Sequence, residues 1–253
     1  MEIINQNWFY LIIFVLGIFY GSFLNFISDN IGNLKRILIG RSKCDSCQKK
    51  LRFLDLVPLF SYAVSFGKCR YCSKKVSWYY PLSELVTGFF LVGIVYYIQL
   101  NNLDLIHFVY YLVNFSILLV IFFYDMKYYE IPFRLVVFGA IFSLIYRFTI
   151  FGDLNANTII YEAPMWLAIF IVFYLIIWIS KGGMGGGDLK LAVYLGIFLG
   201  FPKIIYSLYY SFILGGIFAF ILLITRKKDM KAKIPFGPFL VIGSLIALHF
   251  VII

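Results

Sequence analysis

The chain has 253 residues, of which 62% are hydrophobic and 13% are charged, and its formal net charge is +10 at pH 7. Soluble domains of this size carry about 25% charged residues, so the composition excludes a soluble globular protein. We expect instead an all-α polytopic membrane protein with about eight transmembrane helices.

Apolar runs long enough to cross a membrane occur along the whole chain, since a helix needs about 20 residues to span a bilayer. The first run follows residues 1–7, which hold Glu2 and no Lys or Arg, so it predicts a signal anchor rather than a cleavable signal. The sixth run is the shortest. The eight runs centre on residues 8–27, 82–100, 105–124, 132–151, 163–180, 190–201, 204–225 and 235–253.

Most of the positive charge lies between the first and second runs. Residues 30–80 hold eleven Lys and Arg residues and only two acidic ones. The positive-inside rule therefore predicts that this segment faces the cytoplasm. A basic segment beside a membrane also meets anionic lipid, so nucleic-acid binding is the less favoured interpretation. Three further connections that contain Lys or Arg are predicted on the same side, at residues 125–131, 181–190 and 226–233.

All four cysteines lie in this basic segment, as the pairs Cys44/Cys47 and Cys69/Cys72 with 21 residues between the pairs. A reducing compartment disfavours disulfides, and two pairs with this spacing can surround one tetrahedral Zn²⁺ ion. We expect a closed structural zinc site that folds a segment with few apolar residues of its own. Disulfides or four unrelated buried thiols are the alternatives.

Two aspartates interrupt or border apolar runs. Asp125 ends the third run shortly before Ile131-Pro132, and Asp188 follows a stretch with five glycines in six positions, residues 182–187. A carboxylate at the membrane boundary is costly, which favours a functional site over chance. The alternatives are an ordinary loop aspartate for the first and a flexible loop for the second. The threading of the runs places both at the cytoplasmic end.

Two carboxylates brought together suit peptide hydrolysis. One ionised aspartate can take a proton from water while its protonated partner donates a hydrogen bond to the scissile carbonyl, the arrangement of the aspartic proteases. Lys190 is expected either to act on Asp188 electrostatically or to anchor the helix at the interface. The glycines beside Asp188 and the Pro-Phe-Gly-Pro stretch before the last run are expected to shape a substrate cleft, with Gly185, Gly187, Pro235 and Gly237 as supporting residues.

Motifs in a fixed order along the chain resemble those of the type IV prepilin leader peptidases, bacterial intramembrane aspartyl proteases with a Gly-x-Gly-Asp motif. The resemblance implies that Asp125 and Asp188 are the catalytic pair. It implies prepilin or pseudopilin substrates with short basic leaders, cleaved at the cytoplasmic face of the bacterial inner membrane. The matching segments are Gly21–Asn25, the two cysteine pairs, Tyr80–Leu85, Asp125 with Ile131-Pro132, Met184–Leu191 and Ile234–Leu240.

Many members of that family also methylate the new N-terminus with S-adenosylmethionine. The resemblance links Gly21, Asn25 and Glu84 to this second activity. The sequence departs from the family pattern at several positions while keeping the aspartates and cysteines, so methyl transfer stays open. The departures are Asn30, Gly32, Asp45, Tyr79 and Phe133.

Three parts are expected along the chain: a first transmembrane helix over 1–29, a cytoplasmic zinc module over 30–80, and a bundle over 81–253 that carries the protease site. An ion-coupled transporter using the same carboxylates is the main alternative function, although it has no use for a four-cysteine module. A membrane anchor that presents a zinc module is the third. The choice of pilin substrates and the oligomeric state are not encoded in these patterns.

Overall fold

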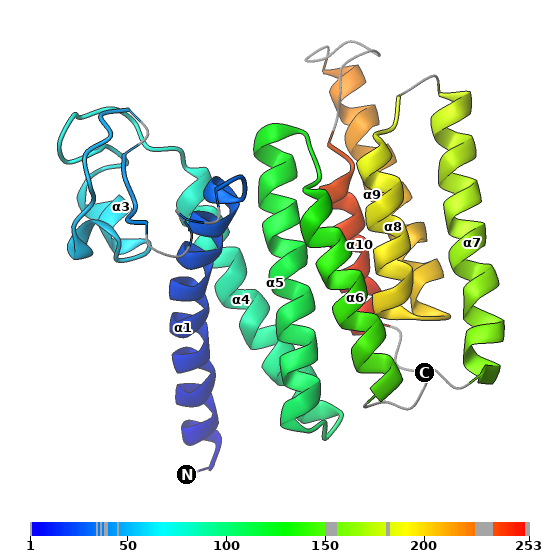
Figure 1. Ribbon diagram of the computed structural model, residues 1–253. Helices are drawn as coiled ribbons and strands as arrows, with labels where there is room; N and C mark the ends of the chain where they lie inside the picture. The colour runs from blue at the N-terminus through cyan, green and yellow to red at the C-terminus, as the bar shows by residue number, and fades with distance from the viewer. Residues whose placement is uncertain are drawn as a thin grey trace. The chain divides into compact units, whose positions relative to one another are not determined.

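The structure, a computed structural model, describes residues 2–33, 35, 37, 40–44, 46–149, 156–180, 183–225 and 235–250 (Figure 1). The predicted basic loop at 226–233 lies outside the described residues. The described part contains eight long helices and no strand, which confirms the all-α prediction. The long helices are α1 (Glu2–Asn30), α4 (Tyr79–Leu100), α5 (Leu105–Tyr128), α6 (Phe133–Thr149), α7 (Ala156–Ile179), α8 (Gly186–Leu199), α9 (Lys203–Ile224) and α10 (Gly237–Phe250).

Five of these helices, α1, α4, α5, α7 and α9, are long and apolar enough to cross a membrane. The other three, α6, α8 and α10, have only 17, 14 and 14 residues. The eight predicted spans therefore correspond to the eight long helices of the described part, five of which have the length of a full span. Many large apolar side chains on α7 and α9 are exposed, as expected for helices that face lipid. The protein is a multi-pass membrane protein.

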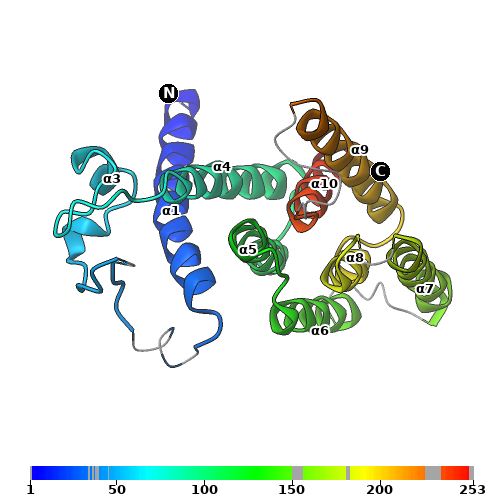
Figure 2. The same cartoon turned by 90° about the horizontal axis from the view of Figure 1, so that it is seen from above.

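The chain forms two compact units, Met1–Leu112 and Val113–Ile253, called here the N-terminal unit and the C-terminal unit. In the N-terminal unit α1 crosses α4 at close range (Figure 2). A Cβ at Gly17 would lie 2.8 Å from Cα of Gly88, and one at Gly21 would lie 2.8 Å from Cβ of Thr87. Small residues bring the two backbones together, as is common between membrane helices.

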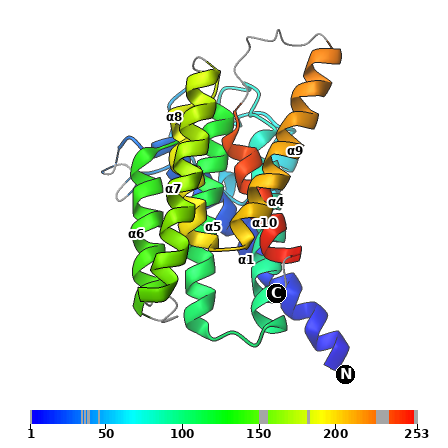
Figure 3. The same ribbon diagram turned by 90° about the vertical axis from the view of Figure 1, so that its right-hand side faces the viewer.

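Helix α8 is the centre of the C-terminal unit. It contacts α6, α7, α9 and α10, and Figure 3 shows it alongside α6 and α7. Its apolar residues point in all directions, which predicts a helix buried on every side. Leu191, Ala192 and Leu195 are indeed fully buried.

A buried polar cluster fixes α8 against two of its neighbours. The hydroxyls of Tyr194 on α8 and Ser143 on α6 each donate a hydrogen bond to Oδ1 of Asn114 on α5, at 2.7 Å. All three side chains are almost fully buried. A hydrogen bond in an apolar interior is costly to leave unmade, so this cluster sets the register of the three helices.

A buried ion pair holds the C-terminal end of α8. Arg147 on α6 and Glu162 on α7 make a bidentate contact with both N–O distances at 2.7 Å. Nη1 of Arg147 also donates to the carbonyl of Ile197 on α8, at 3.1 Å. The ion pair between Arg147 and Glu162 was not predicted from the sequence. Because a buried charge without its partner is strongly destabilising, the pair ties α6, α7 and α8 together.

Candidate functional site

The Asp125 carboxylate lies at the end of α5 and is only 4% exposed. Its Oδ2 accepts a hydrogen bond from the backbone N–H of Gly237, the first residue of α10, at 3.0 Å. The first N–H groups of a helix have no partner within the helix and favour a negative charge, so α10 offers this carboxylate both a donor and a favourable field. A Cβ at position 237 would come within 2.6 Å of Oδ2, so any larger residue there would displace the carboxylate.

The Asp188 carboxylate lies in the first turn of α8 and is 8% exposed. Its Oδ2 accepts a hydrogen bond from the backbone N–H of Gly185, at 3.1 Å. Gly185 precedes the helix in an extended conformation, with φ −75° and ψ 142°. A carboxylate that caps the start of its own helix in this way is stabilised when ionised.

Ile131, in the connection between α5 and α6, joins the surroundings of both aspartates. A Cβ at Gly187 would lie 3.0 Å from Cβ of Ile131, and one at Gly237 would lie 3.3 Å from its Cδ1. The end of α5 and the beginnings of α8 and α10 therefore meet at one end of the C-terminal unit.

The supporting residues predicted from the sequence have different positions. Gly185 and Gly237 each donate to a carboxylate, Gly187 packs on Ile131, and Pro235 lies two residues before α10. The ammonium of Lys190 lies over the ring of Phe133, at 4.2 Å from its centroid. Two buried carboxylates at close range can share one proton, an arrangement that can supply both an acid and a base.

A second candidate site lies in the N-terminal unit, in the segment of chain that connects α1 to α4. The sulfur atoms of Cys44, Cys47, Cys69 and Cys72 all lie within 4.8 Å of one another, and the Sγ atoms of Cys44 and Cys72 are 3.9 Å apart. Four thiolates around a zinc ion with Zn–S bonds of about 2.3 Å have sulfurs about 3.8 Å apart. The cluster could therefore hold one metal ion.

Two turns of the same form present these thiols. In the first, the N–H of Gln48 donates to the carbonyl of Cys44, and in the second the N–H of Ser73 donates to the carbonyl of Cys69, both at 2.8 Å. Gln48 and Ser73 both have left-handed backbones, with φ 56° and 57°. Isolated bridges close the turns, Lys43 with Lys50 and Lys68 with Lys75.

Two of the four thiols have pKa shifts in opposite directions. The backbone N–H of Cys47 lowers the pKa of Cys44 to about 7. Although the N–H of Lys74 favours the thiolate of Cys72, burial and the neighbouring sulfurs raise the pKa of that thiol to about 11. A metal ion would remove this conflict by neutralising the thiolates and releasing their protons.

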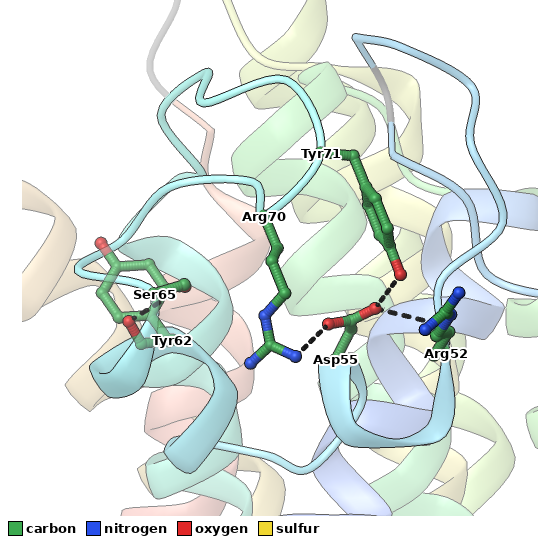
Figure 4. Close-up of polar contacts among 6 residues, drawn as sticks. All are labelled: Arg52, Asp55, Tyr62, Ser65, Arg70 and Tyr71. Atoms are coloured by element: carbon green, nitrogen blue, oxygen red, sulfur yellow. Dashed lines mark hydrogen bonds and ion pairs between the residues drawn. The ribbon is translucent and has the colours of Figure 1, made fainter.

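A polar network links the second cysteine turn to the short helix η1 (Phe53–Asp55), as Figure 4 shows. The carboxylate of Asp55 accepts from the N–H of Arg52 at 3.0 Å and from the hydroxyl of Tyr71 at 2.8 Å, and pairs with Nη1 of Arg70 at 3.3 Å. Partial burial opposes ionisation, yet these donors hold the pKa of Asp55 below its usual range. These contacts of Asp55 could not be predicted from the sequence, because only the fold brings η1 to the second cysteine pair.

The three residues that the resemblance links to methyl transfer lie together where α1 crosses α4. A Cβ at Gly21 would lie 3.0 Å from Cα of Glu84. The side chain of Asn25 donates to the hydroxyl of Ser83 at 2.6 Å, while its buried Oδ1 has no hydrogen-bond partner among the described residues. Glu84 is 8% exposed and its Oε2 accepts from the N–H of Leu59 at 2.9 Å. The cluster thus presents acceptor oxygens in an apolar helix interface.

The apolar helices and the paired aspartates define a multi-pass membrane protein with a buried two-carboxylate site. Residues 112–220 match the Type IV leader peptidase family, and residues 15–98 match the Bacterial Peptidase A24 N-terminal domain. The chain belongs to the type IV leader peptidase family, which confirms the resemblance. No solved structure gives a significant match.

Curated relatives match this chain over most of its length. The chain is 28% identical to the prepilin leader peptidase/N-methyltransferase of Bacillus subtilis, over 93% of this chain and 92% of that protein. It is 30% identical to the protein of the same name from Aeromonas salmonicida, over 84% of this chain and 72% of that protein. A third, from Stutzerimonas stutzeri, is 25% identical over 96% and 91%.

Replacing Gly237 by Ala tests the geometry of this site. The added Cβ would meet Oδ2 of Asp125, so we expect the carboxylate to move and the rate of leader cleavage to fall at least tenfold, with the fold retained. The measurement is cleavage by purified protein, together with its melting temperature. Gly216→Ala on α9 is the matched control, because no atom lies within 4 Å of a Cβ there. Wild-type rates for Gly237→Ala would contradict the assigned contact.

Proposed function

We propose that this protein is a membrane-embedded aspartyl endopeptidase that removes the leader of type IV prepilins and pseudopilins, with Asp125 and Asp188 as its catalytic pair. The observation that carries the proposal is the meeting of two buried carboxylates at one end of the C-terminal unit, each with a backbone N–H donor. The transporter alternative has no support among the relatives, which are named as peptidases.

The chemistry follows from the shared proton. The ionised aspartate takes a proton from a water molecule as the water attacks the scissile carbonyl, and the protonated one donates to the carbonyl oxygen. The proton taken from water then passes to the leaving amine as the C–N bond breaks. Gly185 is exposed and leaves the backbone before Asp188 open to an extended substrate, while Gly187 allows Ile131 to approach the start of α8. Pro235 and Gly237 complete the cleft from the start of α10.

The proposed orientation places this site and the residue 30–80 module in the cytoplasm, with the helices in the bacterial inner membrane. The support is the distribution of charge, since eleven Lys and Arg residues lie in that segment. The 81–253 part is then the protease bundle, preceded by the first transmembrane helix over 1–29.

Replacing either aspartate by Asn tests the function directly. We expect Asp125→Asn and Asp188→Asn to reduce prepilin cleavage to background, because an amide can neither take nor share the proton. Purified protein in detergent, incubated with a prepilin that carries a basic leader, gives the measurement. The exposed Asp104, in the loop before α5, provides the control Asp104→Asn, which should cleave normally. Continued cleavage by either dyad variant would exclude the mechanism.

The four cysteines are proposed to hold a structural zinc ion. All four ligand positions are supplied by thiolates, so the ion would have no open position for a substrate, and its role would be to join the two cysteine turns. We expect Cys44→Ser to remove most of the zinc from the purified protein. Metal analysis measures this, with Ser73→Ala in the second turn as control. An unchanged zinc content in Cys44→Ser would refute the site.

N-methylation is a second candidate function, supported by the names of the relatives and by the acceptors between α1 and α4. The partnerless Oδ1 of Asn25 and the carboxylate of Glu84 fit the ammonium group of S-adenosylmethionine or the new N-terminal amine of the pilin. S-adenosylmethionine, when bound, would supply the methyl group. The chain's own part would be to bind one of these amines and to orient the new N-terminal amine of the pilin toward the methyl donor.

Glu84→Gln separates the two activities. The amide oxygen can still accept from the N–H of Leu59, so we expect normal leader cleavage but loss of the methyl group from the product. Mass spectrometry of the mature pilin, after full cleavage with S-adenosylmethionine present, gives the answer. A methylated product from Glu84→Gln would remove this residue from the methyl-transfer site, and an unmethylated product from wild type would argue for a peptidase alone.

A further inference from the structure

The segment between α1 and α4 carries an apolar surface that nothing covers among the described residues. The rings of Phe53, Phe60 and Phe66 are 79%, 60% and 89% exposed, and Leu54 and Val64 are 61% and 49% exposed. These five residues, called here the apolar face, lie on η1, on the short helix α3 (Phe60–Val64) and directly after it. Phe60 and Val64 share one side of α3, and α3 contacts η1.

The backbone presents this surface at a cost. Phe66 has φ +50° and is followed by Gly67 with φ +67°, while Leu59, before α3, has φ +58°. A left-handed conformation is unfavourable for large side chains and is kept where the surroundings or a function require it. Phe66, whose ring is the most exposed of the segment, thus has a strained backbone conformation. Packing of its ring against the described residues does not compensate for this strain.

The charges of the segment complement an anionic partner. Nine Lys and Arg residues between 41 and 75 are exposed. Asp55, in contrast, is partly buried, pairs with Arg70, and accepts hydrogen bonds from Tyr71 and the N–H of Arg52 (Figure 4). Among the described residues between 41 and 75, every exposed charged side chain is therefore cationic.

The position of the segment indicates which anionic partner this is. It begins after α1 and ends at Trp78, which is 69% exposed and directly precedes α4. In Figure 1, α3 lies at the level of the last turns of α1 rather than beyond its end. Since α1 and α4 are long and apolar enough to cross a membrane, a segment at this level would lie at the depth of the lipid headgroups. Aromatic rings with flanking Lys and Arg are typical of segments that lie in this interface.

We propose that the apolar face inserts into the headgroup region of an anionic bilayer beside α1, while the surrounding Lys and Arg side chains bind lipid phosphates. Insertion would bury Phe53, Phe60 and Phe66, which no part of the described chain covers. It would also hold the cysteine turns close to α4, where the N–H of Leu59 already reaches Glu84. The proposal concerns the lipid around the protein and does not depend on its catalytic activity.

A photoreactive phenylalanine at position 66 tests the insertion in the full-length protein. The protein carrying p-benzoylphenylalanine is placed in nanodiscs of phosphatidylcholine, with or without phosphatidylglycerol, and irradiated. We expect a covalent lipid adduct, detected by mass spectrometry and several-fold more abundant with phosphatidylglycerol. The same probe at Ser46, an exposed polar position in the first cysteine turn, is the control and should give little adduct.

Charge variants test the phosphate contacts. Lys74→Gln with Lys75→Gln should lower the adduct at position 66 several-fold, whereas Lys74→Arg with Lys75→Arg should keep it. Zinc content and leader cleavage verify that each variant is folded. The proposal is overturned if position 66 gives no lipid adduct, if the two lipids give equal adducts, or if added prepilin takes the place of lipid in the adduct. The same experiment in Asp125→Asn, where catalysis is absent, should give the wild-type adduct and so separates this proposal from the catalytic one.

Discussion

Two backbone N–H groups at the beginnings of helices allow a pair of carboxylates to exist inside an apolar bundle. The N–H of Gly237 binds Asp125 and the N–H of Gly185 binds Asp188, so each acid is satisfied without a buried cation beside it. A lysine or arginine in the same place would favour the ionised form of a carboxylate and so oppose the sharing of a proton that the proposed mechanism requires. Backbone donors avoid this, because they carry only a partial charge.

This arrangement requires the helix that carries Asp188 to keep a fixed position. Helix α8 has only 14 residues and must present its first turn at the site without sliding along its neighbours. The hydrogen bonds of Tyr194 and Ser143 to Asn114 fix its middle, and the carbonyl of Ile197 is held by Arg147, itself paired with Glu162. Polar contacts in an apolar medium are specific in direction, whereas apolar packing alone would permit a shift by one turn.

Much of the fold and site could be predicted from the sequence because the relevant signals are local. Apolar runs give the helices, the cysteine spacing gives the cluster, and a carboxylate beside glycines gives Asp188. The pairing of Arg147 with Glu162 could not be predicted in this way, since each is a single charge near an apolar run and only the packing of α6 against α7 and α8 makes them partners. The contacts of Asp55 and of Ile131 were hidden for the same reason. The position of each depends on segments that meet only in three dimensions.

The likeness of the two cysteine turns has a consequence for how the segment between α1 and α4 assembles. Each turn closes through its own short-range hydrogen bonds, from Gln48 to Cys44 and from Ser73 to Cys69, so neither turn needs contacts from the other in order to close. A metal ion at the proposed zinc site would therefore join two preformed turns rather than order the whole segment. The entropy lost in that step would be mainly that of closing one loop, which grows only slowly with loop length.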